Sequence, residues 1–159
     1  MKLISGGQSG VDRAVLDVAI DFGIDYGGWC PKGGWAEDLP QPPGVLARYP
    51  ELKETPLADP AQRTEWNLRD ADACMILIDD GGLDLSAGTR LAEELAHSHR
   101  KPLLIVRLER GAAEHARLWL RVQQARHRGG LTLAIGGPRE SEAPGIYARA
   151  ADFLRALLD

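Results

Sequence analysis

The sequence predicts an α/β fold, a three-layer α/β/α sandwich with a mainly parallel sheet of about five main strands. Strand-like and helix-like segments alternate along the 159 residues, and such alternation specifies parallel strands joined by right-handed helical crossovers. The segment 73–78 is apolar at every position, which is typical of a central parallel strand covered on both faces. No linker or internal repeat divides the chain, so we expect residues 1–159 to form one Rossmann-like ligand-binding domain.

The individual elements follow from apolar spacing and from the glycines and prolines between them. Gly23 ends the first helix, whose apolar residues fall on one helical face: Val11, Ala14, Val15, Val18, Ala19 and Phe22. The expected strands are residues 3–5, 24–29, 73–78, 103–108 and 131–135. The expected helices are residues 10–22, 61–70, 89–100, 112–127 and 145–158.

Residues 30–60 form a long connection that contains seven prolines. Long connections without regular structure are uncommon in compact domains and are often lids or binding loops. We therefore include Lys32 among the candidate ligand contacts. Arg63 and Asn67, which follow this stretch, lie four residues apart on one face of a predicted helix and could reach the same site. The alternative for this pair is an ordinary helix surface.

The composition excludes several classes of function. The net charge is −4 and lysines and arginines do not cluster, so we expect no nucleic-acid partner. Cys30 and Cys74 cannot form a disulfide framework, and no Cys/His spacing suits a metal site. No apolar run reaches the length of a membrane span, and the N-terminus lacks the pattern of a signal peptide. We therefore expect a cytoplasmic protein with no membrane partner.

Ligands of parallel sheets bind beyond the carboxyl ends of the strands, so the segment after the first strand is the first candidate site. Its glycines allow close approach of the backbone, and the following helix start offers unpaired amides and a positive dipole end. Gln8 rules out the dinucleotide fingerprint, and no Gly-Lys-Ser/Thr follows to make a triphosphate loop. The alternative is a tight turn before an ordinarily capped helix. The candidate ligand-binding residues here are Gly6, Gly7, Gln8, Ser9, Gly10, Asp12 and Arg13.

Two further junctions have the same character. After the buried strand, Gly88 and Thr89 lie at the start of a helix, where they could hold an anionic group. The alternative is a solvated flexible loop, and the aspartates nearby lack the spacing of a calcium loop. After the last strand, Arg139 and Ser141 are candidates, because an arginine can bind a phosphate or carboxylate bidentately. The alternative for Arg139 is a surface salt bridge.

These residues carry a resemblance to a known family. The segment 5–14, Ser-Gly-Gly-Gln-Ser-Gly-Val-Asp-Arg-Ala, resembles the opening of the putative molybdenum carrier family. The resemblance covers nearly the whole chain, and it continues through residues 27–33, 36–38, 49–50, 54–55, 63–72, 88–89, 137–141 and 144–147. The family is similar to a wider Rossmann-like group that includes lysine-decarboxylase-like proteins and nucleotide-sensing domains.

The resemblance implies a small anionic ligand, with molybdenum cofactor (molybdopterin) or a nucleotide as the cofactor, and a homo-oligomer. Some members of the wider group cleave an N-glycosidic bond with a glutamate three residues after the Gly-Thr. Ala92 stands at that position here, followed by Glu93 and Glu94, and Ala87 stands where a second glycine usually precedes the Gly-Thr. This departure argues against the hydrolase activity but not against phosphate binding by Gly88 and Thr89.

Three hypotheses follow. The first is a carrier or binding protein for a phosphorylated heterocycle, in which Lys32, Arg63 and Arg139 supply countercharge. The second is a nucleotide N-glycosidase-like hydrolase, with Asp12 and Glu94 as candidate catalytic residues that stabilise positive charge or activate water. The third is a sensor that reports the ligand to a partner.

Overall fold

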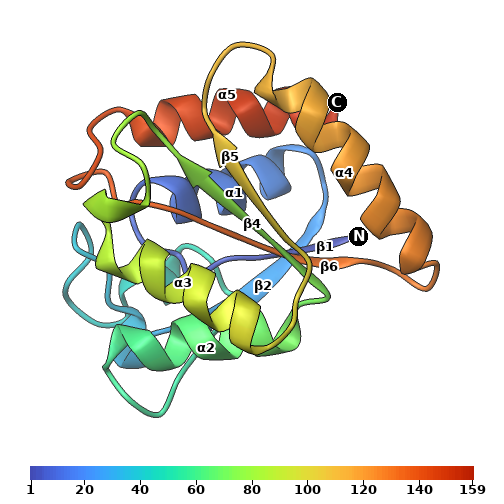
Figure 1. Cartoon of the computed structure of the whole chain (residues 1–159). Coiled ribbons are helices and arrows are strands. Elements are labelled where there is room, and N and C mark those ends of the chain that lie inside the picture. Colours follow the sequence, from blue (N-terminus) through green and yellow to red (C-terminus); the bar gives the residue numbers. More distant parts are fainter.

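The computed structural model describes residues 1–159, which form a six-stranded sheet with every pair of neighbouring strands parallel. The strand order is β3-β2-β1-β6-β4-β5 (Figure 1). The strands are β1 (Lys2–Ile4), β2 (Asp25–Cys30), β3 (Leu52–Glu54), β4 (Ala73–Ile78), β5 (Leu103–Arg107) and β6 (Thr132–Gly136). The helices are α1 (Val11–Asp21), α2 (Pro60–Asp70), α3 (Ala87–Ser98), α4 (Ala112–Arg126) and α5 (Ile146–Leu158). The predicted α/β sandwich is confirmed, with one strand more than expected.

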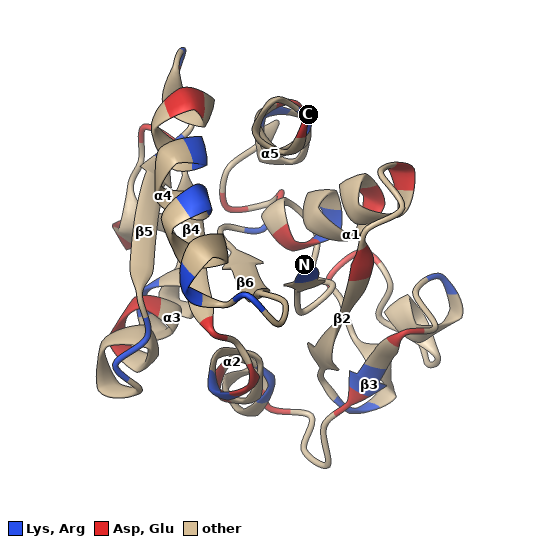
Figure 2. Cartoon of the chain, turned by 90° about the vertical axis from the view of Figure 1, so that its right-hand side faces the viewer, with Lys and Arg blue, Asp and Glu red and all other residues tan.

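The two faces of the sheet are covered unequally. Helices α1, α4 and α5 lie on one face and α2 and α3 on the other (Figure 2). The first face holds the main core, a cluster of 23 buried apolar residues, whereas a cluster of only six lies under α2 and α3. The thinner face therefore leaves room for a cavity. None of the helices combines the length and the apolar composition that a membrane crossing requires.

The strand order brings three loops to one place. The last strand, β6, lies between β1 and β4, where Leu3 and Ala73 both pair with Leu133. The chain leaves β1 toward β2 on one side and leaves β4 toward β5 on the other. The carboxyl ends of these central strands thus open a crevice of the kind in which α/β proteins bind ligands.

The proline-rich stretch is packed against the domain. It contains the sixth strand, β3, and the short 3-10 helices η1 (Lys32–Gly34) and η2 (Gly44–Ala47). Its residues Val45, Tyr49 and Leu52 are buried in a small cluster with Leu16 of α1. The Tyr49 hydroxyl also donates a hydrogen bond to the carboxylate of Asp17, at 2.5 Å. The stretch is therefore held to α1 along its length.

Candidate ligand-binding site

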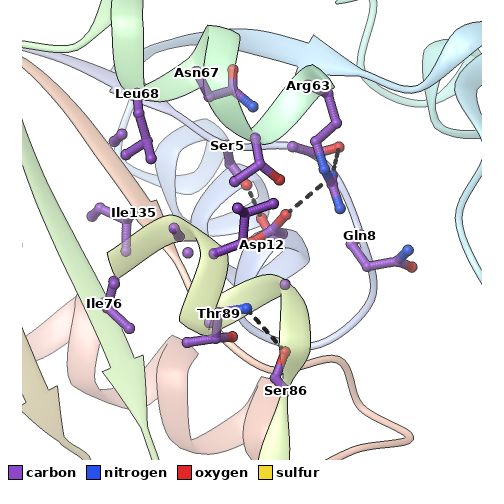
Figure 3. A pocket seen from close by; sticks show the side chains of 18 of the residues that line it. Ser5, Gln8, Asp12, Arg63, Asn67, Leu68, Ile76, Ser86, Thr89 and Ile135 are labelled. Atoms are coloured by element: carbon purple, nitrogen blue, oxygen red, sulfur yellow. Dashed lines mark hydrogen bonds and ion pairs between the residues drawn. The ribbon is translucent and has the colours of Figure 1, made fainter. Parts of the chain in front are cut away.

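A cavity of about 130 Å³ lies between helices α2 and α3, the carboxyl ends of β1 and β6, and the first half of β4 (Figure 3). One part of its wall is apolar and includes Leu68, Ile76 and Leu91. The polar part comes from the loops after the strands and from α2. Among the residues expected at a binding site, eight line this cavity: Gly6, Gln8, Asp12, Arg63, Asn67, Gly88, Thr89 and Arg139. The first and second glycine-bearing junctions thus meet in one cavity.

At the start of α1, a buried carboxylate faces a buried guanidinium. Arg63 Nη1 lies 3.6 Å from Asp12 Oδ2 and donates a hydrogen bond to the carbonyl oxygen of Gly6 at 3.0 Å. Figure 3 shows the two side chains pointing toward each other from α1 and α2. Burial raises the pKa of Asp12, while Arg63 and the backbone amides of Gln8 and Gly6 favour its charged form. The Arg63 guanidinium therefore already has a partner within the protein.

This arrangement requires a glycine at position 6. A Cβ atom built there would lie 2.1 Å from Arg63 Nη1 and 2.9 Å from Asp12 Oδ2. Ser5 fixes the helix start from the other side, because its hydroxyl donates to the backbone carbonyl of Asp12 at 2.9 Å. The start of α1, and with it the backbone of Asp12, is therefore held at the cavity wall.

The start of α3 is open by comparison. Ser86 caps the helix by accepting a hydrogen bond from the Thr89 amide at 3.2 Å. The amides of Ala87 and Gly88 have no acceptor within the protein. The Thr89 hydroxyl is buried and also has no hydrogen-bond partner. This helix end therefore offers donors and a positive dipole end to the cavity.

A second unpartnered polar atom lies at the α1 end. The Gln8 carbonyl oxygen accepts hydrogen bonds from the amides of Ser9, at 3.0 Å, and Glu37, at 2.9 Å. These bonds fix the side chain, yet its Nε2 is buried with no partner. Buried polar groups are paired in the great majority of cases. Two exceptions on the wall of one cavity indicate a place where a ligand completes the hydrogen bonding.

Asn67 and Arg139 line the cavity in different ways. The Asn67 side chain is fully engaged, because it accepts from the Trp29 amide at 2.7 Å and donates to the Trp29 carbonyl at 2.9 Å. It therefore joins α2 to β2. The Arg139 guanidinium lies 5.7 Å from the centre of the Trp35 ring and 4.0 Å from the Glu142 carboxylate. Arg139 is thus the cavity cation with the weaker internal pairing.

The structure does not bring Ser9 and Ser141 to the cavity. Both serine hydroxyls donate to the Glu37 carboxylate, that of Ser141 at 2.6 Å. The Ser9 hydroxyl also accepts from the amide of Glu140 at 3.2 Å. These contacts hold the pKa of Glu37 below its usual value. Their role is to fasten the proline-rich stretch across the loops after β1 and β6.

Gly7 and Arg13 also serve structure. The Arg13 guanidinium is buried, makes two 2.9 Å hydrogen bonds to the Asp38 carboxylate and donates to the Gly7 carbonyl. Gly10 packs against the backbone of residues 138–140, and Lys32 is exposed outside the cavity. The sequence alone could not show that the proline-rich stretch contacts Gly7 and Arg13 in place of a ligand.

Glu94, a candidate catalytic residue, is exposed on α3 and does not line the cavity. The α3 residues that do, beyond Gly88 and Thr89, are Leu91 and Ala92. Sequence reasoning in turn missed Ser86 and Glu142. Ser86 could have been predicted, because a serine just before the first turn of a helix is a typical N-cap residue.

The comparisons with known proteins agree with the fold. Residues 3–158 match the family described as the circularly permutated YpsA SLOG family. The crystal structure of a protein named putative molybdenum carrier protein, from Syntrophus aciditrophicus SB, is 39% identical with a TM-score of 0.85. The match covers 99% of this chain and 94% of that one. No curated protein matches the chain. The resemblance read from the sequence is thereby confirmed, and the chain belongs to the circularly permutated YpsA SLOG family, alongside a relative named as a molybdenum carrier.

Proposed function

We propose that the protein binds a phosphate-bearing heterocycle in this cavity and acts as a binding or carrier protein. The observation that carries the proposal is the buried, unpartnered hydroxyl of Thr89 beside the free amides of Ala87 and Gly88. A phosphate at a helix N-terminus accepts hydrogen bonds from such groups and is stabilised by the helix dipole. The name of the structural relative makes molybdenum cofactor the first ligand to test.

The remaining walls suit the rest of such a ligand. Arg139 supplies countercharge near the mouth, and Leu68, Ile76 and Leu91 offer an apolar surface to a flat ring. Typical small-molecule sites measure about 300–1,000 Å³, so a cavity of about 130 Å³ encloses part of the ligand. The other part would lie at the mouth, where it meets solvent.

The residues fit the organic part of molybdenum cofactor. Its phosphate would be held by Gly88 and Thr89 and its ring by the apolar wall. No cluster of His, Cys, Asp or Glu could bind the metal directly, and burial raises the pKa of the Cys74 thiol to about 12. The cofactor would bring its metal on its own dithiolene, so the task of this chain would be to hold and shelter it.

The test is ligand-dependent stabilisation of the purified protein. Pterin phosphates, nucleoside monophosphates and molybdate are each titrated while the melting temperature is recorded, because a ligand that binds the folded state raises it. We expect a phosphorylated ligand to raise the melting temperature, and we expect Thr89→Val to weaken its binding about tenfold, the effect of one hydrogen bond to a charged group. Absence of any shift, or equal affinity for Thr89→Val, would overturn the proposal.

Arginine variants give a matched comparison. Arg139→Gln removes the cavity cation, whereas Arg121→Gln removes an exposed cation from α4, outside the cavity. We expect Arg139→Gln to lower the affinity for the phosphorylated ligand and Arg121→Gln to leave this affinity unchanged. Equal effects would mean that only the net charge of the protein matters, and this would contradict a specific phosphate-binding site in the cavity.

One observation favours a second candidate function, hydrolysis of a nucleotide N-glycosidic bond. Asp12 places a carboxylate at the cavity, where it could stabilise positive charge that develops on a ribose. Release of free base from nucleoside monophosphates tests this activity. We expect Asp12→Asn to abolish release and the exposed Glu94→Gln to preserve it; no release by the unaltered protein would exclude the hydrolase.

A further inference from the structure

We propose that Asp12 is a built-in anion that occupies the seat at the start of α1, so that the cavity accepts ligands with a single anionic group. This inference rests on the proposed function, because it assumes that the ligand's phosphate binds at α3. It adds a rule of selection: the α1 end repels a second phosphate and receives a neutral polar group.

The first step is the set of groups around the Asp12 carboxylate. Arg63 Nη1 lies 3.6 Å from the carboxylate, and both side chains are largely buried. Burial raises the pKa of Asp12, and the guanidinium of Arg63 opposes this by favouring the charged carboxylate. An arginine and the amides of a glycine-rich loop are also the groups that would hold a ligand phosphate. The protein thus pairs this arginine internally, whereas at α3 the buried hydroxyl of Thr89 has no partner.

The second step is that the carboxylate cannot move aside. Asp12 lies in the first turn of α1, its backbone carbonyl is held by the Ser5 hydroxyl, and its side chain is only 13% exposed. A ligand anion that approached this end would meet a carboxylate that is largely shielded from solvent. Repulsion between like charges is strong in such surroundings.

The third step is what the α1 end still offers. Gln8 and Asp12 both line the cavity, where the Gln8 Nε2 is an unpartnered donor and the Asp12 carboxylate can accept. A neutral group that both donates and accepts, such as the amide edge of a heterocycle or a hydroxyl, matches this pair. The preferred ligand therefore carries one phosphate and presents a neutral polar edge at its other end.

The experiment is a calorimetric titration of inorganic phosphate into four proteins: the unaltered chain, Thr89→Val, Asp12→Ala and the double variant. We expect the unaltered chain to bind one phosphate at α3, and Thr89→Val to bind it about tenfold more weakly. Asp12→Ala should gain a second phosphate, which persists in the double variant. Glu94→Ala, which removes an exposed carboxylate outside the cavity, should gain none.

The outcomes separate the two proposals. If the unaltered chain binds phosphate and Asp12→Ala gains no site, the built-in anion is refuted while the proposed function stands. If only Asp12→Ala binds phosphate, the built-in anion stands and the seat at α3 fails. Melting curves in phosphate-free buffer establish that each variant is folded.

A second variant serves if Asp12→Ala does not fold. Asp12→Asn keeps the shape of the side chain and removes its charge. We expect the unaltered protein to prefer a nucleoside 5′-monophosphate to the 3′,5′-bisphosphate of the same nucleoside by about tenfold or more. Asp12→Asn should reduce this preference to about threefold or less; an unchanged preference would overturn the inference.

Discussion

The substitution Thr89→Val should make the ligand-free protein more stable and lower its affinity for the ligand. The Thr89 side chain is buried and its hydroxyl has no partner. Valine has nearly the same shape, so the exchange replaces an unsatisfied polar group by a methyl group and leaves no void. Threonine and valine also have similar helix propensities, so α3 itself is not expected to change.

The size of the gain follows from the state of that hydroxyl. A buried polar group without a hydrogen bond costs about 1–3 kcal/mol. The adjoining cavity of about 130 Å³ can hold water, which would satisfy the hydroxyl in part. We therefore take the lower end and expect a gain of about 1 kcal/mol in the free energy of unfolding, or about 2–4 °C in melting temperature for a domain of this size.

The assay is thermal and urea unfolding of both proteins without ligand, with Thr55→Val as a matched control. Thr55 is equally buried, but its hydroxyl donates to the carbonyl of Leu57 at 2.8 Å. The same exchange there should destabilise by about 1 kcal/mol, because it removes a hydrogen bond that the folded protein makes. A melting temperature for Thr89→Val at or below that of the unaltered protein would refute the reasoning.

Two further predictions concern the frame around the cavity. Asp38→Asn should lower the free energy of unfolding at pH 7 by about 1 kcal/mol, a discounted value because Asp38 is half exposed. The hydrogen bond from Arg13 holds the pKa of Asp38 below its usual 3.8, so its contribution is present above that pH and lost as the pH falls through the lower folded-state pKa; urea unfolding should show the two proteins converging there. Gly28→Ala should prevent folding or cost more than about 3 kcal/mol, because its φ is 130° and a Cβ would lie 2.3 Å from the Ser5 carbonyl oxygen. Gly23→Ala, where a Cβ meets open space, should cost only about 1–2 kcal/mol; similar losses at the two glycines would contradict the steric argument.

The sequence predicted the central elements well because their patterns are strong. The strand at residues 73–78 is found with the expected bounds, since a strand buried on both faces is apolar throughout. The sixth strand was missed because Leu52–Glu54 is only three residues long, lies at the sheet edge and is enclosed by Pro50 and Pro56. So short an edge strand carries no recognisable alternation.

The site shows the same division. Parallel strands end at one edge of a sheet, so the meeting of residues 6–10 with residues 88–89 could be expected from the order of elements. The order of elements does not show which side chains enter the cavity. Arg13 and Ser9 bind the proline-rich stretch, and Asp12 meets Arg63 only because α2 packs across the opposite face of the sheet. Such choices depend on long-range packing that local patterns do not encode.

The two helix starts at the cavity are therefore treated in opposite ways. At α1, the chain pairs its own carboxylate, Asp12, with the cavity arginine Arg63. At α3, it leaves the buried Thr89 hydroxyl without a hydrogen-bond partner, which lowers the stability of the free protein. A protein that bound no ligand would be more stable if the Thr89 hydroxyl also had a partner within the chain. The asymmetry is understandable if one anionic group arrives from outside, and it makes the α3 end the place where binding and stability oppose each other.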